Sequence, residues 1–219
     1  MSSKVSDNAI IRKVFNDLES HYGYFIWWPS DDAYQIMLGA ILVQNTNWNN
    51  AQKAIDNLGE RLNPRSISAM NLDELAPLIR PSGYYNQKAI KIKALTAWYA
   101  QYRFDIELVR AQEFDRLRSE LLAIKGVGGE TADVILTYAI GKASFVIDAY
   151  ARRIFSRFGL TVPKSYESFR DMMQQAIASD TKIYAYYHGL MVEHGQRFCK
   201  KRPMCEECPL FFECKKLGI

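Results

Sequence analysis

Four cysteines lie close together near the C-terminal end of this chain, which contains no others. They are spaced C-x5-C-x2-C-x5-C, at Cys199, Cys205, Cys208 and Cys214. Four thiolates from one short loop can enclose a metal centre without ligands from distant parts of the fold. Two disulfides are the alternative, but they need an oxidising compartment, and the first residues lack the apolar core and cleavage site of a secretory signal. We therefore expect a metal site.

The spacing of the cysteines leaves the identity of the metal open. Structural zinc sites usually use two separated C-x2-C pairs, whereas this chain has one such pair, Cys205 and Cys208, flanked by single cysteines on longer arms. Iron–sulfur clusters also take four cysteine ligands, and their spacing is more varied. Both kinds of centre are consistent with the loop.

Two further motifs could carry chemistry. The segment 122–132 reads LAIKGVGGETA and places three glycines between two helical patterns. Glycines allow a tight turn, and a helix that starts near Gly129 would present free N–H groups to a phosphate; an ordinary turn between helices is the alternative. Asp148 follows the largely apolar run 143–147 and begins another helical stretch. Taken alone, this carboxylate is most simply explained as a helix cap.

The elements that must position these residues are predicted to be helices. Apolar residues recur at helical spacing in the segments 11–18, 34–42, 92–99 and 135–139. Turn residues separate the segments, and at one such break Ser30 or Asp31 can cap the helix that follows. No stretch alternates in the manner of a strand. The sequence therefore predicts an all-α fold of about ten short helices.

The composition of the 219-residue chain fits a globular protein with a basic loop. The length is enough for one large domain or two small ones, and at 48% hydrophobic residues the chain should fold without a partner. No apolar run approaches the roughly 20 residues of a membrane span. The net charge is +4. Lys200, Lys201 and Arg202 lie in the first arm of the cysteine loop, where they could contact nucleic acid phosphates; a soluble basic tail is the alternative.

Together these motifs resemble the helix-hairpin-helix DNA glycosylase superfamily, and endonuclease III in particular. That family reads L-P-G-V-G-x-x-T-A, then a short helix, then V-D, then a loop with four cysteines. This chain has IKGVGGETA at 124–132, VID at 146–148 and the loop 199–214. QNTN at 44–47 resembles the segment whose glutamine enters the DNA stack, and GYYNQKA at 83–89 resembles the family's G-x-Y-x-x-K-A segment. Motif order and spacing agree at five places.

The resemblance implies a two-lobed, all-α glycosylase fold. A six-helix lobe would span residues 31–145 and carry the helix-hairpin-helix motif at about 117–140, while a second lobe would join residues 1–30 to 146–219. The loop 199–214 would hold a [4Fe-4S] cluster, although its first arm has five residues where the family usually has six. The expected partner is double-stranded DNA with a damaged base, bound by a cytoplasmic, nucleoid-associated monomer without membrane attachment.

The resemblance also implies roles for individual residues. Asp148 would be the catalytic carboxylate, and Gln44 would fill the gap that a flipped base leaves in the DNA. The DNA-binding residues would be Lys125, Gly126, Val127, Gly128, Gly129 and Thr131 of the hairpin, with Lys200, Lys201 and Arg202 of the cysteine loop. Bifunctional members carry a Schiff-base lysine where this chain has Glu130, and a carboxylate cannot form an imine. We therefore expect no AP-lyase activity.

Trp27, Trp28 and Trp48 indicate the substrate. Together with Glu130 they resemble the 3-methyladenine DNA glycosylase III branch, which places aromatic residues around the flipped base but is not defined by a cysteine loop. N-alkylation makes a purine cationic, so that aromatic faces attract it and it leaves readily. The sequence thus predicts a monofunctional glycosylase that removes alkylated purines such as 3-methyladenine. In its base pocket, Glu130 would either face the base or favour the helix N-terminus.

Three alternatives remain. A bifunctional endonuclease III-like enzyme would act on damaged pyrimidines and cleave the strand. A catalytically silent protein would use the hairpin and the basic loop only to bind DNA. A structural protein would use the four cysteines to hold zinc.

Overall fold

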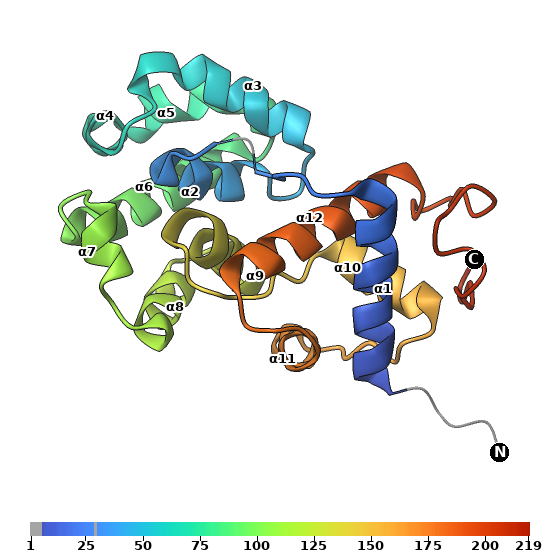
Figure 1. The fold of residues 1–219 in the computed structure, drawn as a ribbon. Helices are drawn as coiled ribbons and strands as arrows, with labels where there is room; N and C mark the ends of the chain where they lie inside the picture. Colours follow the sequence, from blue (N-terminus) through green and yellow to red (C-terminus); the bar gives the residue numbers. More distant parts are fainter. Residues whose placement is uncertain (1–5, 29) are drawn as a thin grey trace. The chain divides into compact units, whose positions relative to one another are not determined.

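The computed structural model describes residues 6–28 and 30–219, and all regular structure in these ranges is helical (Figure 1). The chain forms two compact units: Ser30–Lys142 makes one, and the N-terminal helix with Ala143–Ile219 makes the other. The first of these units ends three residues earlier than the predicted lobe 31–145. Within the described ranges, no helix is long and apolar enough to cross a membrane.

The unit Ser30–Lys142 contains eight α-helices, where six were predicted. They are α2 (Ala33–Leu42), α3 (Trp48–Leu58), α4 (Pro64–Ala69), α5 (Leu72–Leu78), α6 (Tyr85–Gln101), α7 (Ile106–Arg110), α8 (Phe114–Ala123) and α9 (Gly129–Val134). Two 3₁₀ turns, η1 (Gly59–Arg61) and η2 (Arg80–Ser82), and a π-helical segment, η3 (Ile135–Ile140), complete it. The additional helices are short and locally capped: Asn63 caps α4, and Asn71 with Glu74 forms a capping box on α5.

Helix α2 is the central element of this unit. Eight of its ten residues are buried, and it packs against α3, α6, α9 and η3. The N-cap of α2 is Asp32, not Ser30 or Asp31 as the sequence predicts. Oδ1 of Asp32 accepts the backbone N–H groups of Tyr34 and Gln35 at 2.8 and 3.0 Å. Asp32 is extended and directly precedes the first helical residue, which is the position from which a carboxylate reaches these donors.

The predicted hairpin is formed by α8 and α9, with η3 continuing the second helix. Gly126 has φ +89°, a left-handed conformation that favours glycine, and Gly128 is the N-cap of α9. The second helix begins at Gly129, as the sequence predicts. The motif spans residues 114–140, close to the expected 117–140.

The other unit consists of α1 (Asp7–Tyr22), α10 (Ala149–Phe158), α11 (Tyr166–Ala176) and α12 (Thr181–Arg197). Helix α1 packs on α11 and α12, and α10 packs on α12. The apolar face of α1 is fully buried at Ile11, Val14 and Leu18. The hydroxyl of Tyr187 on α12 donates to the Ile11 carbonyl at 2.7 Å. Helices from the two ends of the chain therefore share one core.

Candidate functional site

Asp148 is a buried carboxylate at the start of α10. It is extended and caps the helix, because its Oδ1 accepts the N–H of Ala151 at 2.7 Å. Its Oδ2 lies 3.7 Å from Nε2 of His188 on α12, and both side chains are at most 10% exposed. The cap uses one carboxylate oxygen and turns the other towards an imidazole. The capping role and a chemical role for Asp148 are thus compatible in one geometry.

The residue after His188 makes room for one of the predicted pocket tryptophans. A Cβ added to Gly189 would lie 2.7 Å from Cβ of Trp27, closer than real Cβ atoms approach. Phe25 packs edge-on against the Trp27 ring, with centroids 6.3 Å apart. Trp27 and Trp28 are both half-buried. One turn of α12 therefore supports both Asp148 and Trp27 in the same unit.

Gln44 bonds to the hairpin, and both belong to the unit Ser30–Lys142. Its Nε2 donates to Oγ1 of Thr131 at 2.8 Å and to the carbonyl of Gly126 at 3.3 Å, while Nζ of Lys91 donates to its Oε1 at 2.7 Å. A Cβ on Gly126 would collide with the Lys91 side chain at 2.4 Å. Glycine at 126 thus allows the turn and the approach of Lys91, and the amide of Gln44 bonds at both ends.

The structure divides the predicted DNA-binding residues of the hairpin into two groups. Lys125, Gly126 and Gly128 are exposed, and Gly129 is half-buried. Val127 and Thr131 are buried, at 5% and 7% exposed, and Thr131 bonds to Gln44. The turn itself is therefore open to a phosphate, while Val127 and Thr131 hold the turn in place.

Two other predicted pocket residues lie at helix N-termini in this same unit. Trp48 is half-buried at the first position of α3, behind the cap Asn47, whose side chain accepts the Asn50 N–H at 3.0 Å. Glu130 is exposed in the first turn of α9, where a carboxylate favours the positive end of the helix. The geometry of Glu130 fits that electrostatic role directly.

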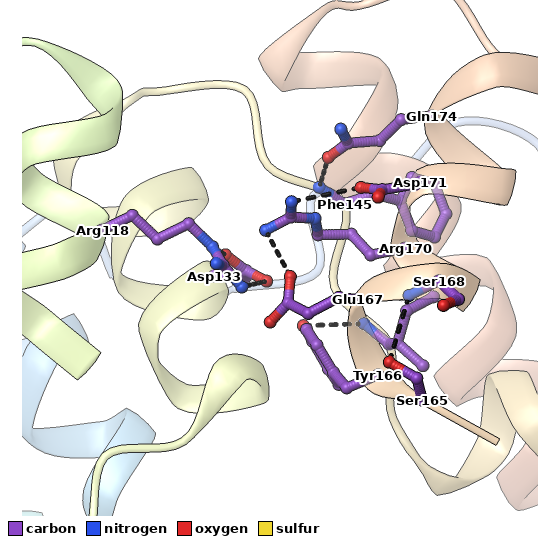
Figure 2. Close-up of polar contacts among 11 residues, drawn as sticks. Arg118, Asp133, Phe145, Ser165, Tyr166, Glu167, Ser168, Arg170, Asp171 and Gln174 are labelled. Atoms are coloured by element: carbon purple, nitrogen blue, oxygen red, sulfur yellow. Dashed lines mark hydrogen bonds and ion pairs between the residues drawn. The ribbon is translucent and has the colours of Figure 1, made fainter.

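A buried ion pair joins the two hairpin helices. Nε and Nη2 of Arg118 on α8 face Oδ1 and Oδ2 of Asp133 on α9 at 2.9 and 3.3 Å (Figure 2). The side chain of Asp133 is fully buried and that of Arg118 is 13% exposed. Such two-pronged pairing fixes both distance and orientation. The ion pair therefore sets how the two helices flank the exposed turn.

Lys88 on α6 has a buried amine that binds backbone carbonyls near Gln44. It is 2% exposed, and its Nζ donates to the carbonyls of Leu42 and Ser82 at 2.8 and 2.6 Å. Burial, with the nearby charge of Lys91, lowers the pKa of Lys88 to about 8. Lys88 thus joins the end of α2, just before Gln44, to the loop before α6.

The lowered pKa of Lys88 predicts a rise in stability with pH. Between pH 8 and the ordinary lysine value of 10.5, the unfolded chain holds a proton that the folded protein has lost. The free energy of unfolding should therefore increase by about 3 kcal/mol over this range. Urea unfolding at several pH values would measure the slope. Lys88→Met should remove it, whereas Lys93→Met, at another lysine that donates to backbone carbonyls, should keep it.

The four cysteines are free thiols, all half-buried, and they line one cavity in the unit that contains α12. Apart from the cysteines, its titratable lining groups are Arg157, His194 and Lys216, and the rest is mainly apolar. Burial raises the pKa of Cys208 to about 11. Across residues 6–28 and 30–219, no three His, Cys, Asp or Glu side chains lie close enough to ligate a single ion.

Arg157 of α10 organises the first arm of the cysteine loop. It donates to the carbonyls of Lys200 and Lys201 at 2.6 and 3.1 Å, and its Nη1 lies 3.5 Å from Sγ of Cys199. The side chains of Lys200, Lys201 and Arg202 are exposed. A buried arginine thus fixes the backbone of a loop whose basic side chains point to solvent. This donor set, four thiols with a guanidinium beside them, fits an anionic thiolate-ligated cluster.

Several residues of these sites carry no pattern that would identify them from the sequence. His188 and His194 lie on the buried face of α12, where a histidine is most often a structural residue. Lys91 and Arg118 look like ordinary solvated helix charges. Lys88 occupies the lysine position of the G-x-Y-x-x-K-A segment, which is the one signal that could have indicated it.

The match to a known family follows from this fold and its motifs. The family model for HhH-GPD superfamily base excision DNA repair proteins matches residues 38–179. The chain belongs to this superfamily and is a DNA glycosylase of base excision repair. The predicted superfamily and all-α fold are thereby confirmed.

Individual relatives include both branches named by the motifs. A protein of Methanocaldococcus jannaschii, named as a candidate DNA repair glycosylase, is 41% identical over 206 residues, which is 92% of this chain and 94% of that one. Endonuclease III of Thermotoga maritima is 30% identical over 186 residues, or 84% and 83% of the two chains. The crystal structure of the H. pylori 3-methyladenine DNA glycosylase bound to 1,N6-ethenoadenine matches with a TM-score of 0.75 at 26% identity, covering 88% of this chain and 98% of that one.

Proposed function

We propose that this protein is a monofunctional DNA glycosylase that hydrolyses the N-glycosidic bond of alkylated purines. The observation that carries the proposal is Glu130. A carboxylate stands in the first turn of the hairpin helix, at the position where the bifunctional members of the family resembled here have an amine. Without that amine the sugar cannot be captured as an imine, so water must be the nucleophile.

Asp148 is the proposed catalytic carboxylate. As the base departs with the electron pair of the glycosidic bond, positive charge develops on the sugar, and a nearby carboxylate stabilises it. The same group orients the attacking water and accepts its proton. The buried Oδ1 is engaged by the Ala151 N–H, which leaves Oδ2, beside His188, as the oxygen for this task. A cationic alkylated base leaves without protonation, so no second acid is required.

Aromatic side chains supply the proposed selectivity. A purine alkylated at a ring nitrogen carries a positive charge, and the faces of indole rings attract cations. Trp27, Trp28 and Trp48 are each half-buried, which leaves part of each ring available to a ligand. The H. pylori relative, a 3-methyladenine DNA glycosylase whose structure contains 1,N6-ethenoadenine, supports a purine substrate.

The four cysteines are proposed to hold a [4Fe-4S] cluster. Cys199, Cys205, Cys208 and Cys214 line the common cavity, and Arg157 beside them would balance part of the negative charge of a bound cluster. The cluster would supply rigidity to the loop rather than chemistry. Lys200, Lys201 and Arg202 would then face DNA phosphates, and the exposed hairpin turn with Lys125 would bind a second stretch of backbone.

The test is base release from matched duplexes that carry 3-methyladenine, 7-methylguanine, an oxidised pyrimidine or mismatched thymine, with and without alkali. We expect release of a methylated purine, strand breaks only after alkali, and no covalent complex with borohydride. Trp48→Ala should lose excision more than DNA binding. Strand breaks without alkali at oxidised pyrimidines would instead establish a bifunctional glycosylase and AP lyase. This is the second candidate, favoured by the 30% identity to endonuclease III of T. maritima.

A further inference from the structure

His194 is a buried histidine with a partner at each ring nitrogen. It lies on α12 and is 1% exposed. Its Nδ1 is 3.3 Å from the hydroxyl of Tyr22, the last residue of α1, and its Nε2 is 3.6 Å from Sγ of Cys208. The backbone carbonyl of His194 also accepts the N–H of Cys199 at 3.0 Å. One residue therefore contacts two of the four cysteines, one through its ring and one through its backbone.

The partners of the ring determine which nitrogen carries the proton. A thiolate that ligates a metal centre carries no proton, so Sγ of Cys208 can only accept a hydrogen bond from Nε2. Burial raises the pKa of Tyr22, so its hydroxyl keeps its proton and can donate. If Tyr22 donates to Nδ1, the single N–H of the ring lies at Nε2 and is directed at Cys208. The chain Tyr22–His194–Cys208 then has one consistent direction of donation.

Cys208 is a half-buried cysteine that lines a mainly apolar cavity, so its thiolate is poorly solvated and gains from such a donor. Arg157, one of the two cations that line this cavity, lies beside Cys199 instead. An N–H directed at a buried thiolate offsets the cost of holding negative charge there, and hydrogen bonds to ligand sulfurs are among the features that set iron–sulfur potentials.

We propose that His194, oriented by Tyr22, donates a hydrogen bond to the Cys208 thiolate and thereby sets both the reduction potential and the retention of the cluster. The proposal rests on the cluster proposed above. His194 is a positioning residue: it acts on the cofactor through its ligand and touches no substrate. Because reduction adds negative charge that is shared by the thiolates, the hydrogen bond favours the reduced cluster.

The test compares variants of the purified, cluster-loaded protein. His194→Leu should shift the reduction potential to a more negative value and accelerate loss of the cluster's visible absorbance under an iron chelator by roughly 10-fold. Tyr22→Phe, at a half-buried and more tolerant position, should change both in the same direction by less. His194→Gln, which keeps an N–H donor, should retain most of the parental behaviour. Tyr187→Phe is the matched control, because it removes a buried tyrosine hydrogen bond that involves no cysteine.

The outcomes separate this role from a merely structural one. Unchanged potential and bleaching in both His194→Leu and Tyr22→Phe would overturn the proposal, as would an equal effect of Tyr187→Phe. If iron analysis shows zinc in place of iron, the cluster itself is overturned together with the role of His194. Iron-loaded protein with unchanged variants would overturn His194 alone and leave the glycosylase proposal standing.

Discussion

Asp148→Asn is expected to reduce excision by about 10²–10⁴-fold while leaving binding to lesion-containing DNA near that of the parent. Asparagine is the informative replacement because it caps a helix about as well as aspartate, so α10 keeps its N-terminal hydrogen bond to Ala151. What it removes is the negative charge beside His188, which would otherwise stabilise the sugar cation and accept a proton from water. Single-turnover excision and a gel-shift titration on the same duplex measure the two quantities.

Asp180→Asn provides a matched control for this experiment. Asp180 caps α12 through the N–H of Ile183 at 2.9 Å, in the same unit and with the same geometry. It should excise at the parental rate. If Asp148→Asn retains activity within a few-fold, Asp148 is a cap and not the catalytic group. If it loses DNA binding as fully as excision, the carboxylate maintains the fold of the site rather than its chemistry.

Arg118→Met should give the largest loss of stability, about 3–5 kcal/mol, because it removes the two charge-assisted bonds that Arg118 makes to the fully buried carboxylate of Asp133. For a chain of this length, that loss corresponds to a fall in Tm of roughly 6–20 °C. The double variant Arg118→Met with Asp133→Leu should recover most of the stability, since apolar side chains of similar size often replace a buried pair at little cost. Thermal unfolding followed by circular dichroism would compare the set.

Arg118→Lys is the companion variant that separates charge from geometry. Lysine keeps the cation but cannot form the two parallel bonds of the guanidinium, so an intermediate Tm is expected. A parental Tm for Arg118→Met, or a double variant as unstable as the single one, would mean that the pair does not hold α8 and α9 together. In that case the hairpin would depend on its apolar contacts alone.

The helical fold could be predicted from the sequence because its signals are local. The apolar spacing of Ile11, Val14 and Leu18 is the buried face of α1, and the glycines of 126–129 form the turn between α8 and α9. Local signals do not decide between neighbouring residues that could each cap the same helix. Ser30, Asp31 and Asp32 are all good caps, and the choice of Asp32 depends on where the buried face of α2 begins, which only the packed core determines.

The motif residues of the candidate site could be proposed from the sequence, but their partners could not. Asp148 could be proposed from the position of VID after the hairpin, whereas His188 lies forty residues further along and reaches it only because α12 packs on α10. The same holds for Gln44, whose bonds to Lys91 and Thr131 join three separate segments. Short helices such as α4 and α5 could not be predicted from apolar spacing, because six or seven residues are too few to show helical periodicity.

The division of one unit between the two ends of the chain has a consequence for its synthesis. Helix α1 leaves the ribosome first, but its partner helix α12 begins only at Thr181, and translation at about 5–20 residues per second separates them by roughly 10–30 seconds. During that interval the apolar face of α1 has no native surface to cover it, while Ser30–Lys142 is already complete. The unit Ser30–Lys142 can therefore fold on the ribosome before the unit that joins α1 to α12.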